Sequence, residues 1–146
     1  MRLCGALAAV VLFAGCGGSG DGVAEKANEA CAAANEQVRS LGPEPRILTA
    51  PQADWLERLT RIDRAAVAKV RALEPPEDER GAIASMLSRF ESGLARGDAI
   101  ARASRRGDFA VLRSEVDAAN ADFGRARAIA ADEGLDECAR VGRVDR

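Results

Sequence analysis

The residues of this chain whose types and spacing could do chemistry are mainly cysteines and carboxylates. The 146 residues include four cysteines (Cys4, Cys16, Cys31 and Cys138) but no histidine and no tyrosine. Histidine is the commonest general base, the commonest metal ligand and the usual partner of a nucleophilic serine or cysteine. The cysteines also lack the C-x-x-C spacing of redox pairs and zinc sites. The sequence therefore predicts no cofactor, no metal site and no catalytic residues.

Composition narrows the function classes further. Lys plus Arg number 21 and Asp plus Glu 23, which gives a net charge of −2. Nucleic-acid-binding domains usually carry a basic excess instead. Hydrophobic residues make up 47% of the chain, which is enough for one packed domain and too many for wholesale disorder. We expect one folded domain and no nucleic-acid partner.

The N-terminus has the pattern of an export signal. Arg2 precedes a continuous apolar stretch over residues 3–14, which is as long as a signal-peptide core and too short to span a bilayer permanently. The stretch ends in Phe13-Ala14-Gly15-Cys16, and on these residues the chain resembles the bacterial lipoproteins. The resemblance implies cleavage before Cys16 and a diacylglycerol on its sulfur, and so an extracytoplasmic protein anchored to the cell membrane. The alternative is an ordinary secretory peptide, which would give a secreted protein.

A stretch rich in Gly and Ser follows the cysteine, over residues 17–22. This composition is typical of a flexible tether. We therefore expect a signal peptide over residues 1–15, the lipid-bearing Cys16 with its tether over 16–22, and a folded domain over 23–146.

Cys31 and Cys138 lie near the two ends of that folded domain. Compartments outside the cytoplasm permit oxidation, so a disulfide between the two is the simplest expectation. It closes a loop of about a hundred residues, for which chain entropy gives a stabilisation on the order of 4–5 kcal/mol. A redox pair or metal ligands are the alternatives, and the lack of C-x-x-C and of histidine argues against both.

Apolar residues recur at three- and four-residue steps in four segments, and no segment alternates with a period of two. The four stripes predict amphipathic helices. Their members are Val23, Ala27, Ala30, Cys31, Ala34, Val38 and Leu41; Leu56, Leu59, Ile62, Ala66, Val70 and Leu73; Ile83, Met86, Leu87, Phe90, Leu94, Gly97 and Ala101; and Phe109, Leu112, Val116, Ala119, Phe123, Ala126 and Ala130. Short connections between four helices favour an all-α, antiparallel up-down four-helix bundle, stapled by the expected disulfide.

Breakers and caps indicate where the first three helices begin and end. We expect Gly42-Pro43 to end the first helix and Thr49 to cap the second, with Gln52 as its capping-box partner. Pro76 is expected to open the third helix, with the acidic residues 77–79 in its first turn.

Glycines mark the later boundaries. Gly107-Asp108 is expected to separate the third and fourth helices, and Gly134-Leu135 to end the fourth in a Schellman motif. Gly93, Gly97 and Ala101 are spaced four apart on the third helix. They indicate either the close approach of a neighbouring helix or tolerated glycines, with a possible break of the helix near Gly97.

Three further motifs of the folded domain are Leu73-Glu74-Pro75-Pro76, Gly107-Asp108 and Gly134-Leu135-Asp136-Glu137-Cys138. On these motifs, together with the lipobox Phe13-Ala14-Gly15-Cys16, the chain resembles small helical lipoproteins of high-GC actinobacteria. The resemblance implies a shared fold and location and brings no activity with it.

Trp55, in the first turn of the second helix, is the aromatic residue with a functional interpretation. It is expected either to cover the end of the bundle as core or to be an exposed contact for a partner.

The acidic group at the end of the fourth helix is interpreted as a solvated helix end, with a bound cation as the alternative; its members are Asp132, Glu133, Asp136 and Glu137. Other carboxylates, including Asp63 and Asp122, are expected on polar faces.

These observations predict a non-catalytic, lipid-anchored envelope protein that binds a protein or cell-wall component of the envelope. The alternative is a carrier of a small apolar ligand or lipid in the interior of the bundle. A core filled with Ala and Leu side chains, without a cavity, would argue against the carrier.

Overall fold

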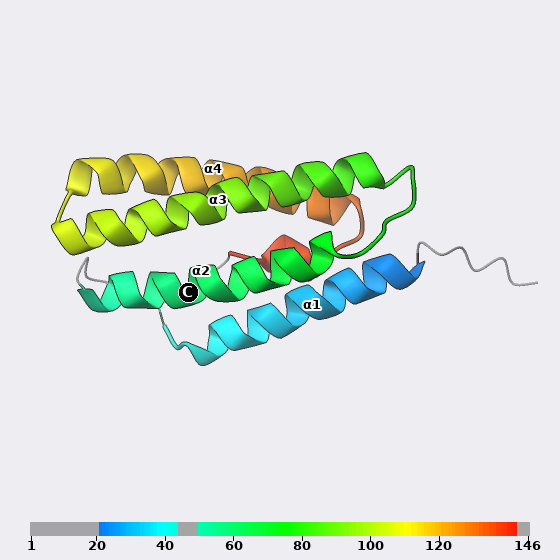
Figure 1. Cartoon of the computed structure of the whole chain (residues 1–146), viewed down its shortest axis with the longest axis horizontal. Coiled ribbons are helices and arrows are strands. Elements are labelled where there is room, and N and C mark those ends of the chain that lie inside the picture. The colour runs from blue at the N-terminus through cyan, green and yellow to red at the C-terminus, as the bar shows by residue number, and fades with distance from the viewer. Residues whose placement is uncertain (1–20, 44–49, 143–146) are drawn as a thin grey trace, which may run out of the picture.

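The computed structural model describes residues 21–43 and 50–142. It contains the helices α1 (Asp21–Ser40), α2 (Ala50–Arg71), α3 (Arg80–Arg106) and α4 (Phe109–Asp132), followed by a short 3-10 helix, η1 (Cys138–Arg140). Successive helices run in opposite directions and each packs on the next (Figure 1). The predicted antiparallel up-down four-helix bundle is therefore confirmed. Cys16, residues 17–20 of the tether and Thr49 lie outside the described residues. The predicted end of the tether is wrong, because α1 begins at Asp21 and residues 21–22 are its first two residues.

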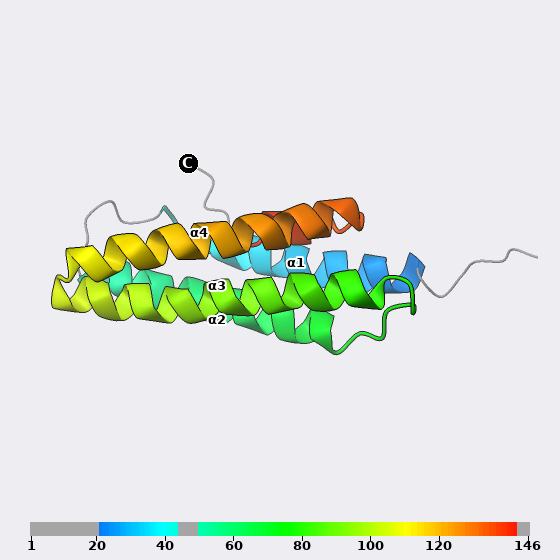
Figure 2. The same cartoon turned by 90° about the horizontal axis from the view of Figure 1, so that it is seen from above.

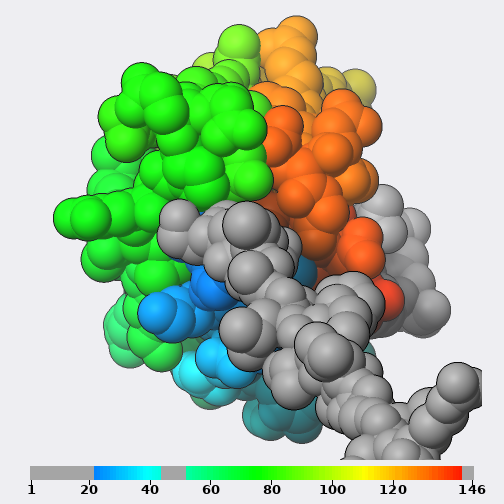
Figure 3. All heavy atoms as spheres, turned by 90° about the vertical axis from the view of Figure 1, so that its right-hand side faces the viewer, coloured from blue at the N-terminus to red at the C-terminus, as the bar shows by residue number. Residues whose placement is uncertain are grey.

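The two ends of the bundle differ in what they contain. Figure 3 looks onto the end at which α1 begins and α4 ends, beside the connection from α2 to α3. The opposite end holds the α3–α4 turn and the start of α2 (Figure 1).

The segment after α4 completes the bundle on its fourth side. Among the described residues, no Cα atom of α1 lies within 8 Å of one in α4, whereas η1 packs on both helices. Figures 1 and 2 show η1 between them. Leu135 and Val141 are each 1% exposed, so this segment supplies core side chains where two facing helices would otherwise meet.

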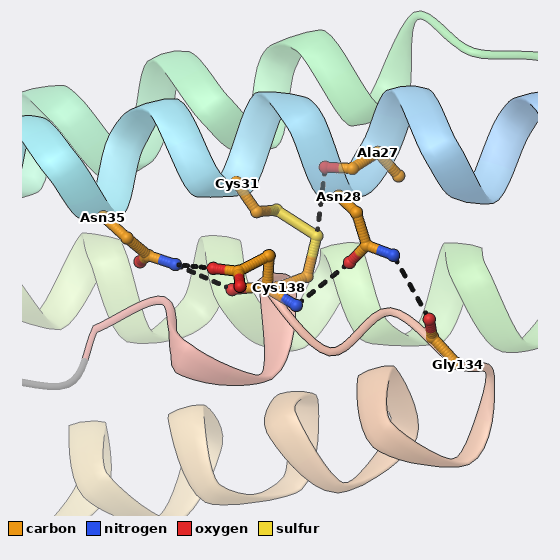
Figure 4. The surroundings of a disulfide bond; sticks show 7 residues. Ala27, Asn28, Cys31, Asn35, Gly134 and Cys138 are labelled. Atoms are coloured by element: carbon orange, nitrogen blue, oxygen red, sulfur yellow. Dashed lines mark hydrogen bonds between the residues drawn. A yellow bond between two sulfur atoms is a disulfide. The ribbon is translucent and has the colours of Figure 1, made fainter.

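A disulfide joins this segment to α1. The Cα atoms of Cys31 and Cys138 are 5.0 Å apart across a sequence separation of 107 residues, and both side chains are buried (Figure 4). The expected staple between the two ends of the domain is confirmed.

Two asparagines of α1 extend the same connection (Figure 4). The side-chain amide of Asn28 donates to the carbonyl of Gly134 at 3.2 Å, and its oxygen accepts from the backbone N–H of Glu137 at 3.0 Å. Asn35 donates to the carbonyl of Glu137 at 2.9 Å. These bonds satisfy backbone groups of Gly134 and Glu137, which lie between α4 and η1, so the segment can be packed inside the bundle at little cost.

The predicted turns on either side of α4 are confirmed. Gly134 has a φ of 70°, and the N–H of Leu135 donates back into the last turn of α4 at 2.7 Å, as in a Schellman motif. Gly107 has a φ of 66°, and the carboxylate of Asp108 caps α4 by accepting from the N–H of Val111 at 3.2 Å.

The predicted start of α3 is wrong. The helix begins at Arg80, with Glu79 as its N-cap residue, and not at Pro76. A separate turn comes first, in which the N–H groups of Glu79 and Arg80 both donate to the carbonyl of Pro76, at 3.2 and 3.0 Å. The acidic residues 77–79 therefore lie before the helix and not in its first turn.

Phe109 was expected on the inner face of α4, but its side chain is 63% exposed. It is the first residue of α4, at the end of the bundle, so no full turn of a neighbouring helix covers it.

The glycines of α3 allow its neighbours to approach closely, and α3 is continuous through Gly97. A Cβ atom on Gly93 would lie 2.9 Å from the ring of Phe123, and one on Gly97 would lie 2.8 Å from Oγ1 of Thr60. On its other side, the Phe123 ring meets Gly142, where an added Cβ would lie 3.1 Å away. A methyl group at either glycine would therefore have to displace the side chain that packs on it from α4 or α2.

Buried apolar side chains form two clusters. One surrounds the disulfide and includes Met86, Leu87 and Phe90, and the other lies toward the α3–α4 turn and includes Ile100 and Leu112. Phe123 packs against both clusters.

We expect Gly93→Ala to lower the free energy of unfolding by about 1–3 kcal/mol, because the methyl group must displace the packed Phe123 ring. Gly124→Ala is the matched control, since Gly124 lies within α4 with nothing within 4 Å of an added Cβ. It should raise the free energy of unfolding by about 0.5–1 kcal/mol through helix propensity. Urea denaturation followed by circular dichroism measures both; equal stability of Gly93→Ala and the wild type would contradict the close packing.

The double variant Cys31→Ala, Cys138→Ala should lose up to about 4–5 kcal/mol of stability, because the unfolded chain regains the entropy of the opened loop. The measurement is thermal and urea denaturation of the variant beside the oxidised and reduced wild type. Reduced wild type should behave like the variant. If the double variant and the reduced wild type both unfold at the same temperature and urea concentration as the oxidised wild type, the disulfide does not stabilise the fold.

Candidate functional site

A cavity of about 250 Å³ lies between α2, α3 and α4, toward the end of the bundle with the α3–α4 turn. Most of its wall is apolar and comes from all three helices, including Leu56, Leu59, Leu94, Ile100, Leu112 and Val116. Its volume is slightly below the range of about 300–1,000 Å³ that is usual for pockets of drug-sized ligands. The interior of the bundle is therefore not filled by Ala and Leu side chains alone.

The space arises from the way α2 and α4 are supported. Both helices pack on α3 and not on each other. Among the described residues, no Cα atom of α2 lies within 8 Å of one in α4. At the other end of the bundle, Leu135 and Val141 fill the interior. Toward the α3–α4 turn the wall contains Ala119, whose short side chain fills little of the space.

Asp63 of α2 is the buried titratable group in the cavity wall. Its side chain is 1% exposed, and its Oδ1 atom has no hydrogen-bond partner among the described residues. Burial raises the pKa of the Asp63 carboxyl from its usual 3.8 to about 7, because a carboxylate loses its hydration there and gains no opposite charge. An unpaired carboxyl in a cavity is typical of a group that receives its partner from a ligand.

Further polar groups line the same cavity. The Oε1 atom of Gln52 is buried without a partner among the described residues. Thr60, 5% exposed, and Asn120 add a hydroxyl and an amide. The described residues of the wall include no Lys or Arg and no titratable group other than Asp63. The cavity thus combines an apolar surface with unpaired oxygen acceptors.

Asp122 of α4 is also buried, but it has partners. Its Oδ2 atom accepts from Oγ of Ser92 at 2.8 Å and from Nε of Arg96 at 3.0 Å. Arg89 lies 3.5 Å from Oδ1, and Arg96 also donates to Glu115 at 3.2 Å. The bonds from Ser92 and Arg96 lower the pKa of the Asp122 carboxyl, so this cluster is an ion-pair network between α3 and α4.

Trp55 lies in the wall of the cavity and is 3% exposed. Its indole Nε1–H donates to the carbonyl of Gly42 at 3.3 Å, across the α1–α2 connection. Trp55 is therefore a core residue, as the first of the two interpretations expected, and is not an exposed contact for a partner.

The acidic group at the end of α4 does not converge on a common point. Glu137 interacts with Asn35 and with Arg140, at 3.2 and 2.8 Å. Within the described ranges, no three His, Cys, Asp or Glu side chains are arranged to hold a metal ion. None of the described helices is both long and apolar enough to cross a membrane.

Sequence reasoning missed Asp63 because it expected one buried stripe on the second helix. That helix packs on both α1 and α3, so it has two inner faces. The second face is marked in the sequence by Leu56, Thr60, Asp63, Val67 and Val70, which also follow three- and four-residue steps. The polar residues in this stripe concealed it, and the prediction that Asp63 and Asp122 lie on polar faces is wrong for both.

The burial of Asp63 predicts that the protein becomes less stable as pH rises toward 7. The folded state still holds the Asp63 proton where the unfolded chain has lost it, so each pH unit between the two pKa values costs about 1.4 kcal/mol. We expect the free energy of unfolding to fall by about 2–3 kcal/mol from pH 5 to pH 7.

Urea denaturation at several pH values between 5 and 8 measures this slope. Asp63→Asn should remove it, whereas Asp117→Asn, on the exposed face of α4, should keep it. The pKa values of Asp122 and Glu57 are lowered by their hydrogen bonds to Ser92 and Arg105, respectively, so their contributions are lost only in more acidic solution. If the free energy of unfolding of Asp63→Asn still falls between pH 5 and pH 7, another titratable group causes the pH dependence.

The chain matches no protein-family model, and no curated protein or solved structure is significantly similar to it.

Proposed function

We propose that the protein is a lipid-anchored envelope protein that carries a small ligand in the cavity between α2, α3 and α4. The observation that carries this proposal is the unpaired carboxyl of Asp63 in an otherwise mostly apolar cavity. Leaving a buried polar atom unpaired costs on the order of 1–3 kcal/mol, and a ligand that supplies a donor recovers part of that cost. Of the two functions expected from the sequence, the carrier is the one that a cavity supports.

The proposed anchor is a diacylglycerol on Cys16, on the strength of the lipobox Phe13-Ala14-Gly15-Cys16. The described fold begins with α1 at the end of the bundle opposite the α3–α4 turn (Figure 1). In the proposed arrangement, the tether therefore joins the bundle at the end away from the cavity. The ligand site then faces the space beyond the membrane surface.

The proposed function is non-catalytic. General acid–base catalysis commonly uses two titratable groups of different pKa at one site. The described wall of the cavity offers one, Asp63. Binding and release are therefore the activities that this set of residues supports.

A module that binds a protein or wall component of the envelope is the second candidate. Phe109 and Val111 favour it, because these large apolar side chains are 63% and 39% exposed at the start of α4. An aromatic side chain of this kind is a typical anchor in a protein interface. The two candidates differ in the purified protein, since only a carrier retains a small molecule.

Mass spectrometry of the full chain, extracted in mild detergent from the membranes of a bacterial host, tests the proposal. We expect a denatured mass that starts at Cys16 and includes a diacylglycerol, and a native mass that includes a non-covalent small molecule. Cys16→Ser should lack the diacylglycerol, because the thioether needs the cysteine sulfur, and should retain the folded domain.

An unlipidated wild-type mass would replace the anchor with the secreted alternative. A lipidated protein with no retained small molecule would favour the second candidate, the module that binds an envelope component.

A further inference from the structure

Polar side chains of α2 line the cavity at two different levels. Asp63 and Gln52 both line it from α2, eleven residues apart, which corresponds to about 16 Å along a helix. Thr60 lies opposite Gly97, and Phe123 lies opposite Gly93, so Asp63 lies at the level of Leu94 and Phe123, near the middle of the bundle. Gln52 lies near the start of α2. The wall between these two levels is largely apolar.

The described wall has acceptors but no positive charge. Two arginines that are next in sequence to residues of the wall have carboxylate partners: Arg64 pairs with Asp98 at 2.9 Å, and Arg96 pairs with Asp122 at 3.0 Å. Arg105 pairs with Asp54 and Glu57. A fatty acid or a phospholipid would bring a carboxylate or phosphate against a wall whose described residues include no Lys or Arg, and burying such an unpaired anion is costly.

We propose that the cavity binds a small amphipathic amine, whose ammonium group donates to the Asp63 carboxylate and whose apolar body lies between α2 and α4. This inference rests on the proposed carrier function and names its class of ligand. An ammonium group supplies both the positive charge and the hydrogen-bond donors that Asp63 lacks. Phe123, at the same level, adds an aromatic ring, a group that attracts cations.

The proposed contact makes affinity depend on pH. The same wall contains Leu94 of α3 and Asn120 and Phe123 of α4, and none of these side chains titrates. Nearby on α2 and α3, Arg64 and Asp98 pair with each other at the surface. An ammonium ion binds the ionised carboxylate, so Asp63 must release its proton. Below the pKa of about 7, affinity should therefore fall by about tenfold for each pH unit.

Three probes with the same alkyl chain test the inference: hexylammonium, hexanol and hexanoate. Isothermal titration calorimetry of the full chain in mild detergent, at pH 5, 6 and 7.5, measures each affinity. We expect hexylammonium to bind at least tenfold more tightly than hexanol at pH 7.5, and hexanoate to bind most weakly. The affinity for hexylammonium should fall steeply at lower pH, whereas that for hexanol should stay constant.

Asp63→Asn should reduce the affinity for hexylammonium at least tenfold, remove its pH dependence and leave the affinity for hexanol nearly unchanged. Retained binding of hexanol also shows that the variant is folded. The surface control Asp117→Asn should bind all three probes like the wild type, because Asp117 is exposed on α4.

Two other outcomes separate this inference from the proposed function. If hexanol binds as tightly as hexylammonium in both the wild type and Asp63→Asn, the cavity takes neutral apolar ligands, and the amine inference is overturned while the carrier function stands. If no probe binds the wild type at any pH, the cavity is not a ligand site, and both the amine inference and the proposed carrier function are overturned.

Discussion

The disulfide between Cys31 and Cys138 holds α1 against the rest of the molecule. In a four-helix bundle the first and last helices commonly complete the core by packing on each other. Here α1 packs on α2 on one side, and on the other side it meets the segment after α4. The covalent bond, together with the hydrogen bonds of Asn28 and Asn35, keeps that segment inside the bundle. The segment fills only one half of the interior, and the other half contains the cavity.

Asp63 and Asp122 show how strongly the surroundings of a buried carboxylate decide its properties. Asp122 has two arginines and a serine within hydrogen-bond reach, and these partners keep it ionised. Asp63 is at least as deeply buried, faces mainly apolar side chains and has no partner for its Oδ1 atom among the described residues. One carboxylate therefore contributes to the fold, whereas the other is maintained at a cost to stability. Such a cost is typical of a functional position.

Much of the fold was predictable from the sequence because its signals are local. Helical periodicity, the Gly134-Leu135 ending and the Asp108 cap each depend on residues within a turn or two. The disulfide was predictable because Cys31 and Cys138 are the two cysteines of the folded domain. The site was not predictable in the same way. Whether Asp63 lies in the core depends on which neighbours α2 packs against, and a single apolar stripe does not carry that information. The start of α3 was missed because the turn that Pro76 begins can either continue into a helix or remain separate.

Phe123 belongs to the surroundings of both hydrophobic clusters, and its ring lies 6.2 Å from that of Phe90, measured between centroids. The two clusters therefore meet at one aromatic residue. Parts of a protein that share few buried contacts open separately, and the part with the weaker core opens at the lower free energy. The half near the α3–α4 turn contains the cavity and lies away from the disulfide. Local opening of that half would widen access to the cavity without breaking the disulfide.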